Sequence, residues 1–210
     1  YLKTLHPIWE VPQRNSQYLY FQDTFWHISS NKITESTYNQ IPHYIWEEQK
    51  KQFPATLTSP LFHVNYDPAN ETWSYSLTEL GKKCDFLRFL ENTSNFTWRK
   101  NSDEVTPQER NENAQHFLAK LSSLGYLCTS VKDYSVAKAV VAVDGKQSEI
   151  GVSNGRSGKS LIGRLLERTV ITQYLNGKSI DLSRDQFVWT ELTNKTKLVF
   201  IDDVRKNFDF

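Results

Sequence analysis

The sequence predicts an α/β fold built on a parallel sheet, and three observations indicate it. An apolar run at residues 139–143 leads into a loop rich in glycine and serine, and a helical pattern begins at Leu161. A second apolar run, from Leu198 to Ile201, ends in two aspartates. The chain between these runs has room for a helix and a further strand. Buried parallel strands are near-continuous apolar runs, and right-handed crossovers through helices connect them.

The glycine-rich loop ends in Gly158-Lys159-Ser160, directly before the helical pattern. Strand, glycine loop, Gly-Lys-Ser and helix is the order that a phosphate-binding P-loop requires. Backbone N–H groups of such a loop point at the phosphates, and the helix dipole adds roughly half a positive charge. We therefore predict that Lys159 reaches the β- and γ-phosphates and that Ser160 ligates Mg²⁺. The predicted nucleotide-binding residues are Ser153, Asn154, Gly155, Arg156, Ser157, Gly158, Lys159, Ser160 and Leu161.

The loop departs from the general P-loop pattern at one position. The pattern G-x-x-x-x-G-K-[ST] places a glycine five residues before Gly158, where this chain has Ser153. Either Ser153 adopts the required dihedral angles, or Gly155 makes the turn two residues later. An ordinary strand–turn–helix without a ligand is the alternative explanation of this stretch.

The apolar run that ends in Asp202 and Asp203 is of the Walker B type. Ligands of open α/β sheets sit at the carboxyl ends of the strands, so this strand would bring its carboxylates beside the phosphates. We predict that Asp202 holds Mg²⁺, directly or through water, and that Asp203 orients and activates the attacking water. The predicted catalytic residues are thus Lys159 and Asp203, and the predicted metal ligands are Ser160 and Asp202. Such a strand end alone often only opens a turn, but Gly-Lys-Ser about forty residues upstream makes it the expected partner.

The first part of the chain is rich in aromatic residues and predicts short strands. Residues 17–28 indicate two strands about a turn at residues 23–24, with a third strand near Ile33 and a brief helix at 45–51. Residues 61–75 are predicted to be extended, with a turn at 67–70. The aromatic cluster is either the core of a small β-rich module, which we favour, or a stacking platform for single-stranded nucleic acid.

Helices are predicted in the middle of the chain from their capping patterns. Ser76 and Glu79 form a capping-box pattern before a helix to residue 95. Thr106, Pro107 and Glu109 open a second helix, which is predicted to stop at Gly125. Basic residues near the first helix fit a solvated face better than phosphate contacts: Lys82, Lys83, Arg88, Arg99 and Lys100. Residues 187–192 indicate a strand or a short amphipathic helix, and residues 193–196 a polar turn.

Composition excludes several classes of protein. The 25 basic and 24 acidic residues give a net charge of +1, so no global basic field indicates nucleic acid, although this balance does not exclude a local basic patch. The two cysteines match no metal or redox spacing, and the histidines show no zinc-site spacing. No segment has the pattern of a signal peptide or of a membrane span, so we expect a cytoplasmic protein with no membrane partner. Because the chain starts at Tyr1 and contains no methionine, we also expect it to be a fragment.

Three stretches of the sequence resemble the helicase part of phage- and plasmid-type primase–helicases. They are residues 138–146, 153–161 and 199–204, and the resemblance is strong over roughly residues 106–210. Upstream, residues 44–47 and 92–96 are similar to the pre-helicase region of that family. The family belongs to the superfamily-three helicases and is related to the poxvirus primase–helicases. The serine at position 153 fits the loop variant of that family.

The resemblance implies an AAA+-like P-loop ATPase core over residues 138–210, truncated at its C-terminal end. A helical collar at 106–137 and a small aromatic-rich α+β module at 1–105 would precede this core. It also implies ATP and Mg²⁺ as cofactors, self-association into a hexameric ring in the parent protein, and single-stranded DNA as partner. The sensor residue and arginine finger of the family would lie beyond Phe210, so we expect weak or no ATPase activity from this chain alone.

Two other functions remain open from the sequence. The same motifs suit a protein that only binds nucleotide, as a switch or an assembly factor. Residues 1–100 could instead be a DNA-binding module joined to a degenerate P-loop, in which case single-strand affinity would fall steeply with salt.

Overall fold

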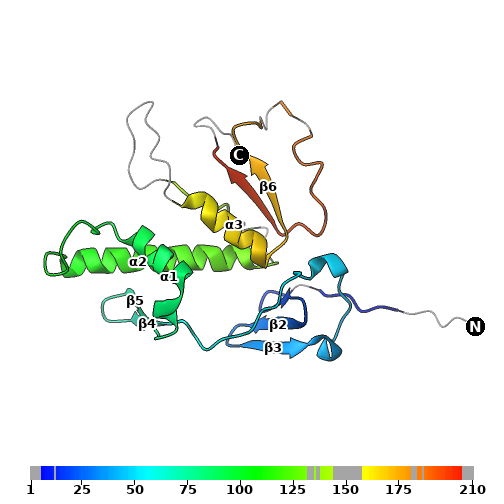
Figure 1. Cartoon of the computed structure of the whole chain (residues 1–210), viewed down its shortest axis with the longest axis horizontal. Helices are drawn as coiled ribbons and strands as arrows, with labels where there is room; N and C mark the ends of the chain where they lie inside the picture. The colour runs from blue at the N-terminus through cyan, green and yellow to red at the C-terminus, as the bar shows by residue number, and fades with distance from the viewer. Residues whose placement is uncertain are drawn as a thin grey trace, which may run out of the picture. The chain divides into compact units, whose positions relative to one another are not determined.

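The structure is a computed structural model that describes residues 6–11, 13–131, 135, 138–143, 158–180, 184–185 and 187–204. It is a mixed α/β protein with small sheets (Figure 1). The chain forms two compact units. The first contains residues 1–57, 127–139 and 159–210, and the second contains 58–126 and 140–158. The division at residues 105 and 137, inferred from the sequence, stays a prediction.

The first unit begins with a three-stranded antiparallel sheet of β1 (Ser16–Tyr20), β2 (Thr24–Ser29) and β3 (Ile33–Thr37). The predicted strands and the turn between the first two are confirmed. Tyr20, Phe21 and Phe25 are buried, so aromatic side chains supply the core of this sheet. Two single 3-10 turns follow, η1 (Tyr38–Gln40) and η2 (Glu47–Gln49), and the second stands where the brief helix was predicted.

The first unit continues with helix α3 (Lys159–Thr169) and the parallel strands β6 (Thr172–Asn176) and β7 (Leu198–Asp202). The helix after Gly-Lys-Ser and the strand ending in aspartate are therefore confirmed. The Lys51 ammonium donates to the backbone carbonyls of Glu167 and Val170, both at 3.0 Å. These bonds satisfy carbonyls that the end of a helix leaves without a partner. They also tie the segment before residue 57 to α3.

The strand predicted at residues 139–143 is not formed. Residues 138–143 have no regular structure, and Val141 and Val143 are 60% and 77% exposed. An apolar run becomes a buried parallel strand only when neighbouring strands pair with it and helices cover it. Among the described residues, β7 pairs with β6 alone, so the parallel sheet has two strands and a complete P-loop sheet is not seen.

The second unit packs a hairpin against two helices. The hairpin joins β4 (Phe62–Asp67) to β5 (Thr72–Leu77), and the predicted turn between them is confirmed. A 3-10 turn η3 (Gly81–Lys83) precedes helix α1 (Asp85–Ser94), and helix α2 (Pro107–Cys128) starts in this unit. Leu90 and Phe117 are fully buried, and the Phe117 ring lies 4.2 Å from that of Tyr75.

The predicted start of the first helix at Ser76 is wrong. Ser76 lies in β5 opposite His63, and α1 begins only at Asp85. Cross-strand pairing thus overrides the capping pattern. The hydroxyl of Thr78 instead accepts the N–H of Gly81 at 3.1 Å, and this bond starts the turn before α1.

Helix α2 begins as predicted but ends later. The Glu109 N–H donates to the Thr106 hydroxyl at 3.2 Å, and the Thr106 N–H donates to the Glu109 carboxylate at 3.0 Å. This is the reciprocal capping box. The helix passes through Gly125 to Cys128, so the predicted stop is wrong. A helical glycine costs only about 1 kcal/mol, which the rest of a helix this long offsets.

The segment before β7 forms turns. Residues 187–191 are neither the strand nor the helix predicted there, because the Phe187 carbonyl accepts both the N–H and the hydroxyl of Thr190. The polar turn at residues 193–196 is confirmed. In the part of the chain that the structure describes, no helix has the length and apolar character needed to cross a membrane.

Candidate functional site

The start of α3 presents the predicted Gly-Lys-Ser sequence. Gly158 has a φ of 84°, a left-handed conformation that favours glycine, and the helix begins at the next residue. Lys159, Ser160 and Leu161 form the first turn, where backbone N–H groups have no helical partner. The loop residues Ser153, Asn154, Gly155, Arg156 and Ser157 lie outside the described residues.

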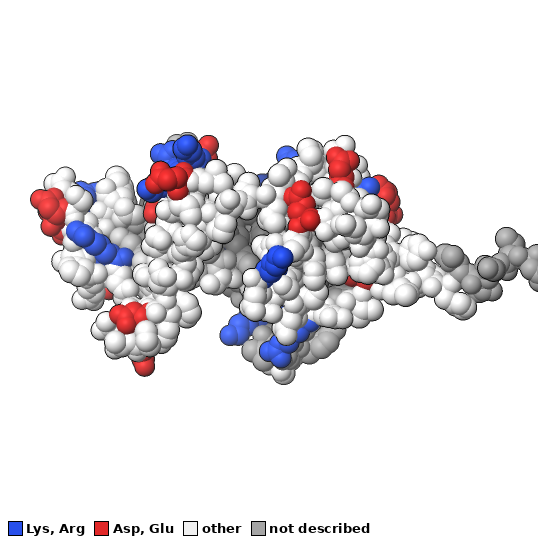
Figure 2. Space-filling model, turned by 90° about the horizontal axis from the view of Figure 1, so that it is seen from below, with Lys and Arg blue, Asp and Glu red and all other residues white. Residues whose placement is uncertain are grey.

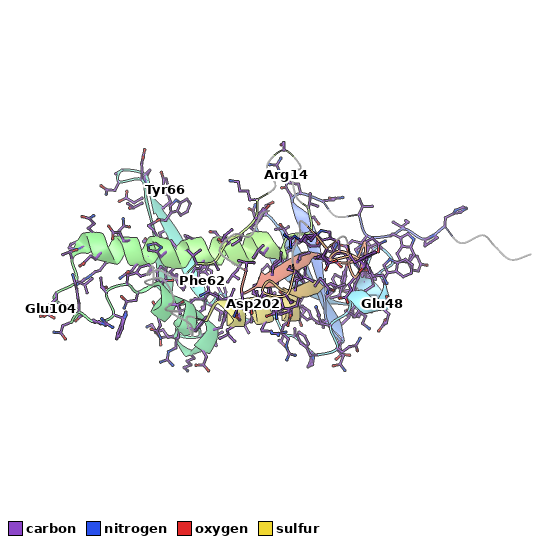
Figure 3. The ribbon with its side chains drawn as sticks, turned by 90° about the horizontal axis from the view of Figure 1, so that it is seen from above. Arg14, Glu48, Phe62, Tyr66, Glu104 and Asp202 are labelled. Carbon is purple, nitrogen blue, oxygen red and sulfur yellow. The ribbon has the colours of Figure 1, made fainter. Side chains whose placement is uncertain are left out.

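Helix α3 packs directly on β7. A Cβ at Gly163 would overlap ring atoms of Phe200, so the helix can approach the strand this closely only at a glycine. Leu166, one turn further, is buried. This packing brings the first turn of α3 next to the carboxyl end of β7, where Figure 3 labels Asp202.

The central contact of the site joins the two predicted motifs. The Ser160 hydroxyl donates to Oδ1 of Asp202 at 3.0 Å, although 42 residues separate them in the sequence. Asp202 is the last residue of β7, so its carboxylate stands at the carboxyl end of the parallel pair. That is the edge where ligands bind in open α/β sheets. The structure therefore brings together the two residues predicted to hold the metal.

A tyrosine from the neighbouring strand also contacts Asp202. The Tyr174 hydroxyl donates to Oδ2 of Asp202 at 2.5 Å, and the Arg164 guanidinium lies 4.3 Å from the centre of the Tyr174 ring. Partial burial acts to raise the pKa of Asp202, but the hydrogen bonds from Tyr174 and Ser160 outweigh it and lower the pKa. The same bond to Asp202 raises the pKa of Tyr174. Asp202 is thus held as a carboxylate.

Asp203 has a different environment. Its φ is 55°, and its carboxylate forms an exposed ion pair with Lys178 at 2.7 Å. The hydrogen bond to Asp203 raises the pKa of Lys178. The water-activating role predicted for Asp203 would require its carboxylate to turn from this ion pair toward the nucleotide.

Three residues of this site were not predicted from the sequence: Arg164, Tyr174 and Lys178. Arg164 follows Ser160 by four residues, a spacing that places both on one face of a helix, and this signal was available. The sequence of residues 174–178, which contains Gly177, predicts a turn, but β6 continues to Asn176 and the turn starts only at Gly177. Side chains alternate between the two faces of a strand. The face on which Tyr174 lies can therefore be predicted only when β6 is known to continue to Asn176.

Ser160 and Asp202 fit the chemistry of a nucleotide-bound Mg²⁺. This ion keeps several waters and takes only one or two protein groups together with the phosphates of its nucleotide. The described residues contain no group of three or more His, Cys, Asp or Glu side chains that could hold a metal. A hydroxyl and a carboxylate already within hydrogen-bond distance suit the nucleotide-dependent kind of site. Bound there, Mg²⁺ would neutralise charge on the phosphates.

The basic residues near α1 carry no comparable site. Lys82 pairs with Glu79 at 2.6 Å, and Lys100 pairs with Glu109 at 2.5 Å. Acidic and basic side chains are interspersed on the face shown in Figure 2. These contacts are typical of a solvated surface, the explanation favoured from the sequence.

Comparisons of the chain with models of protein families, with curated proteins and with solved structures found no match. The function proposed below therefore depends on the geometry of the site and on its sequence motifs.

Proposed function

We propose that the start of α3 and the end of β7 form part of a site for ATP with Mg²⁺. The hydrogen bond between Ser160 and Asp202 carries this proposal. A P-loop serine and an acidic strand end are the two protein groups by which P-loop proteins hold the metal of their nucleotide. In this chain the two groups come from positions 42 residues apart in the sequence and meet at the carboxyl edge of a parallel pair.

The remaining groups of the site have complementary roles. The backbone N–H groups and the dipole at the start of α3 attract phosphate oxygens. Lys159, in that turn, supplies a positive charge for the β- and γ-phosphates. Asp202, kept ionised by its hydrogen bonds, supplies the negative charge that the metal requires. Together these groups provide binding and orientation, which dominate catalysis of phosphoryl transfer.

We further propose that the protein is an ATPase of the primase–helicase kind. In such a protein, ATP hydrolysis drives movement on single-stranded DNA, and copies of the chain assemble into a ring. The support for this step is the resemblance of the three sequence stretches around the two motifs.

A second candidate is nucleotide binding without hydrolysis, as in a switch or assembly protein. The ion pair between Asp203 and Lys178 favours it, since the carboxylate assigned to water activation has another partner. ATP turnover with and without single-stranded DNA separates the two functions. We expect the 210-residue chain to bind ATP and to turn it over slowly or not at all; rapid, DNA-stimulated hydrolysis would contradict that expectation.

The test of the site is a double-mutant cycle on ATP affinity, measured by calorimetry with Mg²⁺ and with excess EDTA. Ser160→Ala and Asp202→Asn should each weaken binding at least about ten-fold in Mg²⁺, because each removes a proposed ligand of the ion, and even the hydrogen-bond partner of a metal ligand contributes about ten-fold. Because both residues act on one ion, the double variant should lose little more than either single variant. In EDTA the losses should largely disappear.

The control for the loss of a negative charge is Asp85→Asn, because the Asp85 side chain is 98% exposed on α1. It should bind ATP as the wild type does under both conditions. A wild-type chain whose ATP affinity does not increase with Mg²⁺ would overturn the proposal, as would losses of the same size in EDTA.

A further inference from the structure

The two oxygens of Asp202 are held by different elements. Oδ1 accepts from Ser160 on α3, and Oδ2 accepts from Tyr174 on β6. In the register of the parallel pair, Tyr174 lies opposite Phe200 and Asn176 lies opposite Asp202. Tyr174 is therefore the diagonal neighbour of Asp202 on one face of the sheet, because side chains two residues apart point to the same side.

The Tyr174 ring is itself fixed from two sides. It lies 5.4 Å from the Phe200 ring, and Arg164 is above it at 4.3 Å. Arg164 also pairs with Glu167 at 3.1 Å on the same helix, which limits the movement of its guanidinium. The ring, and with it the hydroxyl, is thus oriented by α3 and β7 together. A tyrosine that only filled space would not need its hydroxyl directed at the carboxylate.

We propose that Tyr174, oriented by Arg164, is a positioning residue that holds the Asp202 carboxylate in the orientation needed for Mg²⁺·ATP. The inference rests on the proposed nucleotide site and adds to it a residue outside the P-loop and Walker B motifs. The Ser160 and Tyr174 bonds use different oxygens of Asp202, so the Tyr174 bond can persist when the Ser160 hydroxyl turns to a metal. The carboxylate then need not be reoriented on binding, and preorganisation of this kind contributes affinity.

The variant Tyr174→Phe removes the hydroxyl and keeps the ring between Phe200 and Arg164. We expect ATP affinity about ten-fold lower in Mg²⁺ and unchanged in EDTA, because removing the hydrogen-bond partner of a metal ligand typically costs about ten-fold or more in metal affinity. A loss confined to Mg²⁺ is a readout that altered ring packing would not produce. The matched control is Tyr66→Phe, because the Tyr66 hydroxyl has no hydrogen-bond partner among the described residues.

A second variant tests the orienting role of Arg164. Arg164→Gln keeps the Tyr174 hydroxyl and removes the cation above its ring. We expect a loss of affinity about three-fold larger in Mg²⁺ than in EDTA, from the size of a cation–π contact. A smaller loss in EDTA follows from removing a cation one turn from the phosphate site.

The possible results distinguish a failure of this inference from a failure of the proposed function on which it rests. If Mg²⁺ does not increase the ATP affinity of the wild-type chain, both the proposed nucleotide site and this inference are refuted. If Tyr174→Phe keeps the full increase in ATP affinity that Mg²⁺ gives the wild type, the proposed role of Tyr174 is refuted and the nucleotide site is not. The same conclusion follows if Tyr174→Phe loses as much ATP affinity in EDTA as in Mg²⁺. An Arg164→Gln variant equal to the wild type removes Arg164 from the proposal.

Discussion

Replacing Lys159 with alanine should weaken ATP binding about 100-fold or more, with Mg²⁺ and in EDTA alike. In the proposed site the Lys159 ammonium contacts two phosphates directly, and charge-assisted hydrogen bonds contribute about 1.5–3 kcal/mol each. The loss should not depend on metal, because lysine binds phosphate oxygens and not the ion. Titration calorimetry of the 210-residue chain with ATP measures it.

The matched control for Lys159→Ala is Arg168→Ala. Arg168 is an exposed cation in the last turn of the same helix, at the opposite end from the proposed phosphate site. Its removal takes away the same charge and should leave ATP affinity within about two-fold, since interactions between exposed charges are screened beyond about 10 Å. Equal ATP affinity in Lys159→Ala and wild type would refute the site.

Replacing Phe117 with alanine should destabilise the second unit by about 3–5 kcal/mol. Phe117 on α2 is fully buried against Tyr75, and truncating a buried phenylalanine removes its burial and leaves a cavity. Domains are stable by only about 5–15 kcal/mol, so most of the margin would be lost. Urea unfolding followed by tryptophan fluorescence measures the shift in midpoint.

Phe96→Ala is the control in the same unit. Phe96 is 55% exposed, so its truncation removes less buried area and should cost well under half as much. Equal losses for the two variants would mean that Phe117 does not occupy the core of the unit.

The elements that the sequence predicted correctly are specified by local patterns. Helix α3 follows Gly-Lys-Ser with regularly spaced apolar residues, and strand β7 is an apolar run closed by Asp202. The hairpin turn at Asp67–Asn70 has its own local bonds, such as the Ala69 N–H to the Asp67 carboxylate at 3.0 Å. Such features need no knowledge of distant residues.

The elements that the sequence predicted wrongly depend on tertiary partners. Ser76 has a capping pattern, but pairing with β4 places it in a strand. Residues 139–143 have the composition of a buried strand, yet they are exposed without a pairing strand. Neither partner can be identified from periodicity within the segment.

The residues of the candidate site also fall into two groups, those that sequence motifs predict and those that depend on tertiary partners. Ser160 and Asp202 carry motifs, so their meeting could be expected once a parallel sheet was assumed. Tyr174 and Lys178 carry none, and only the register of β6 against β7 and the turn after β6 bring them to the two aspartates.

The most direct test of the central claim locates the bound metal. Mn²⁺ accepts the same oxygen ligands as Mg²⁺ and broadens the NMR signals of nearby nuclei. With a non-hydrolysable ATP analogue and a low concentration of Mn²⁺, the isotope-labelled chain should show the strongest broadening at Ser160, Leu161, Asp202 and Asp203. Broadening that requires no nucleotide, or that is strongest at residues away from α3 and β7, would contradict the proposed site.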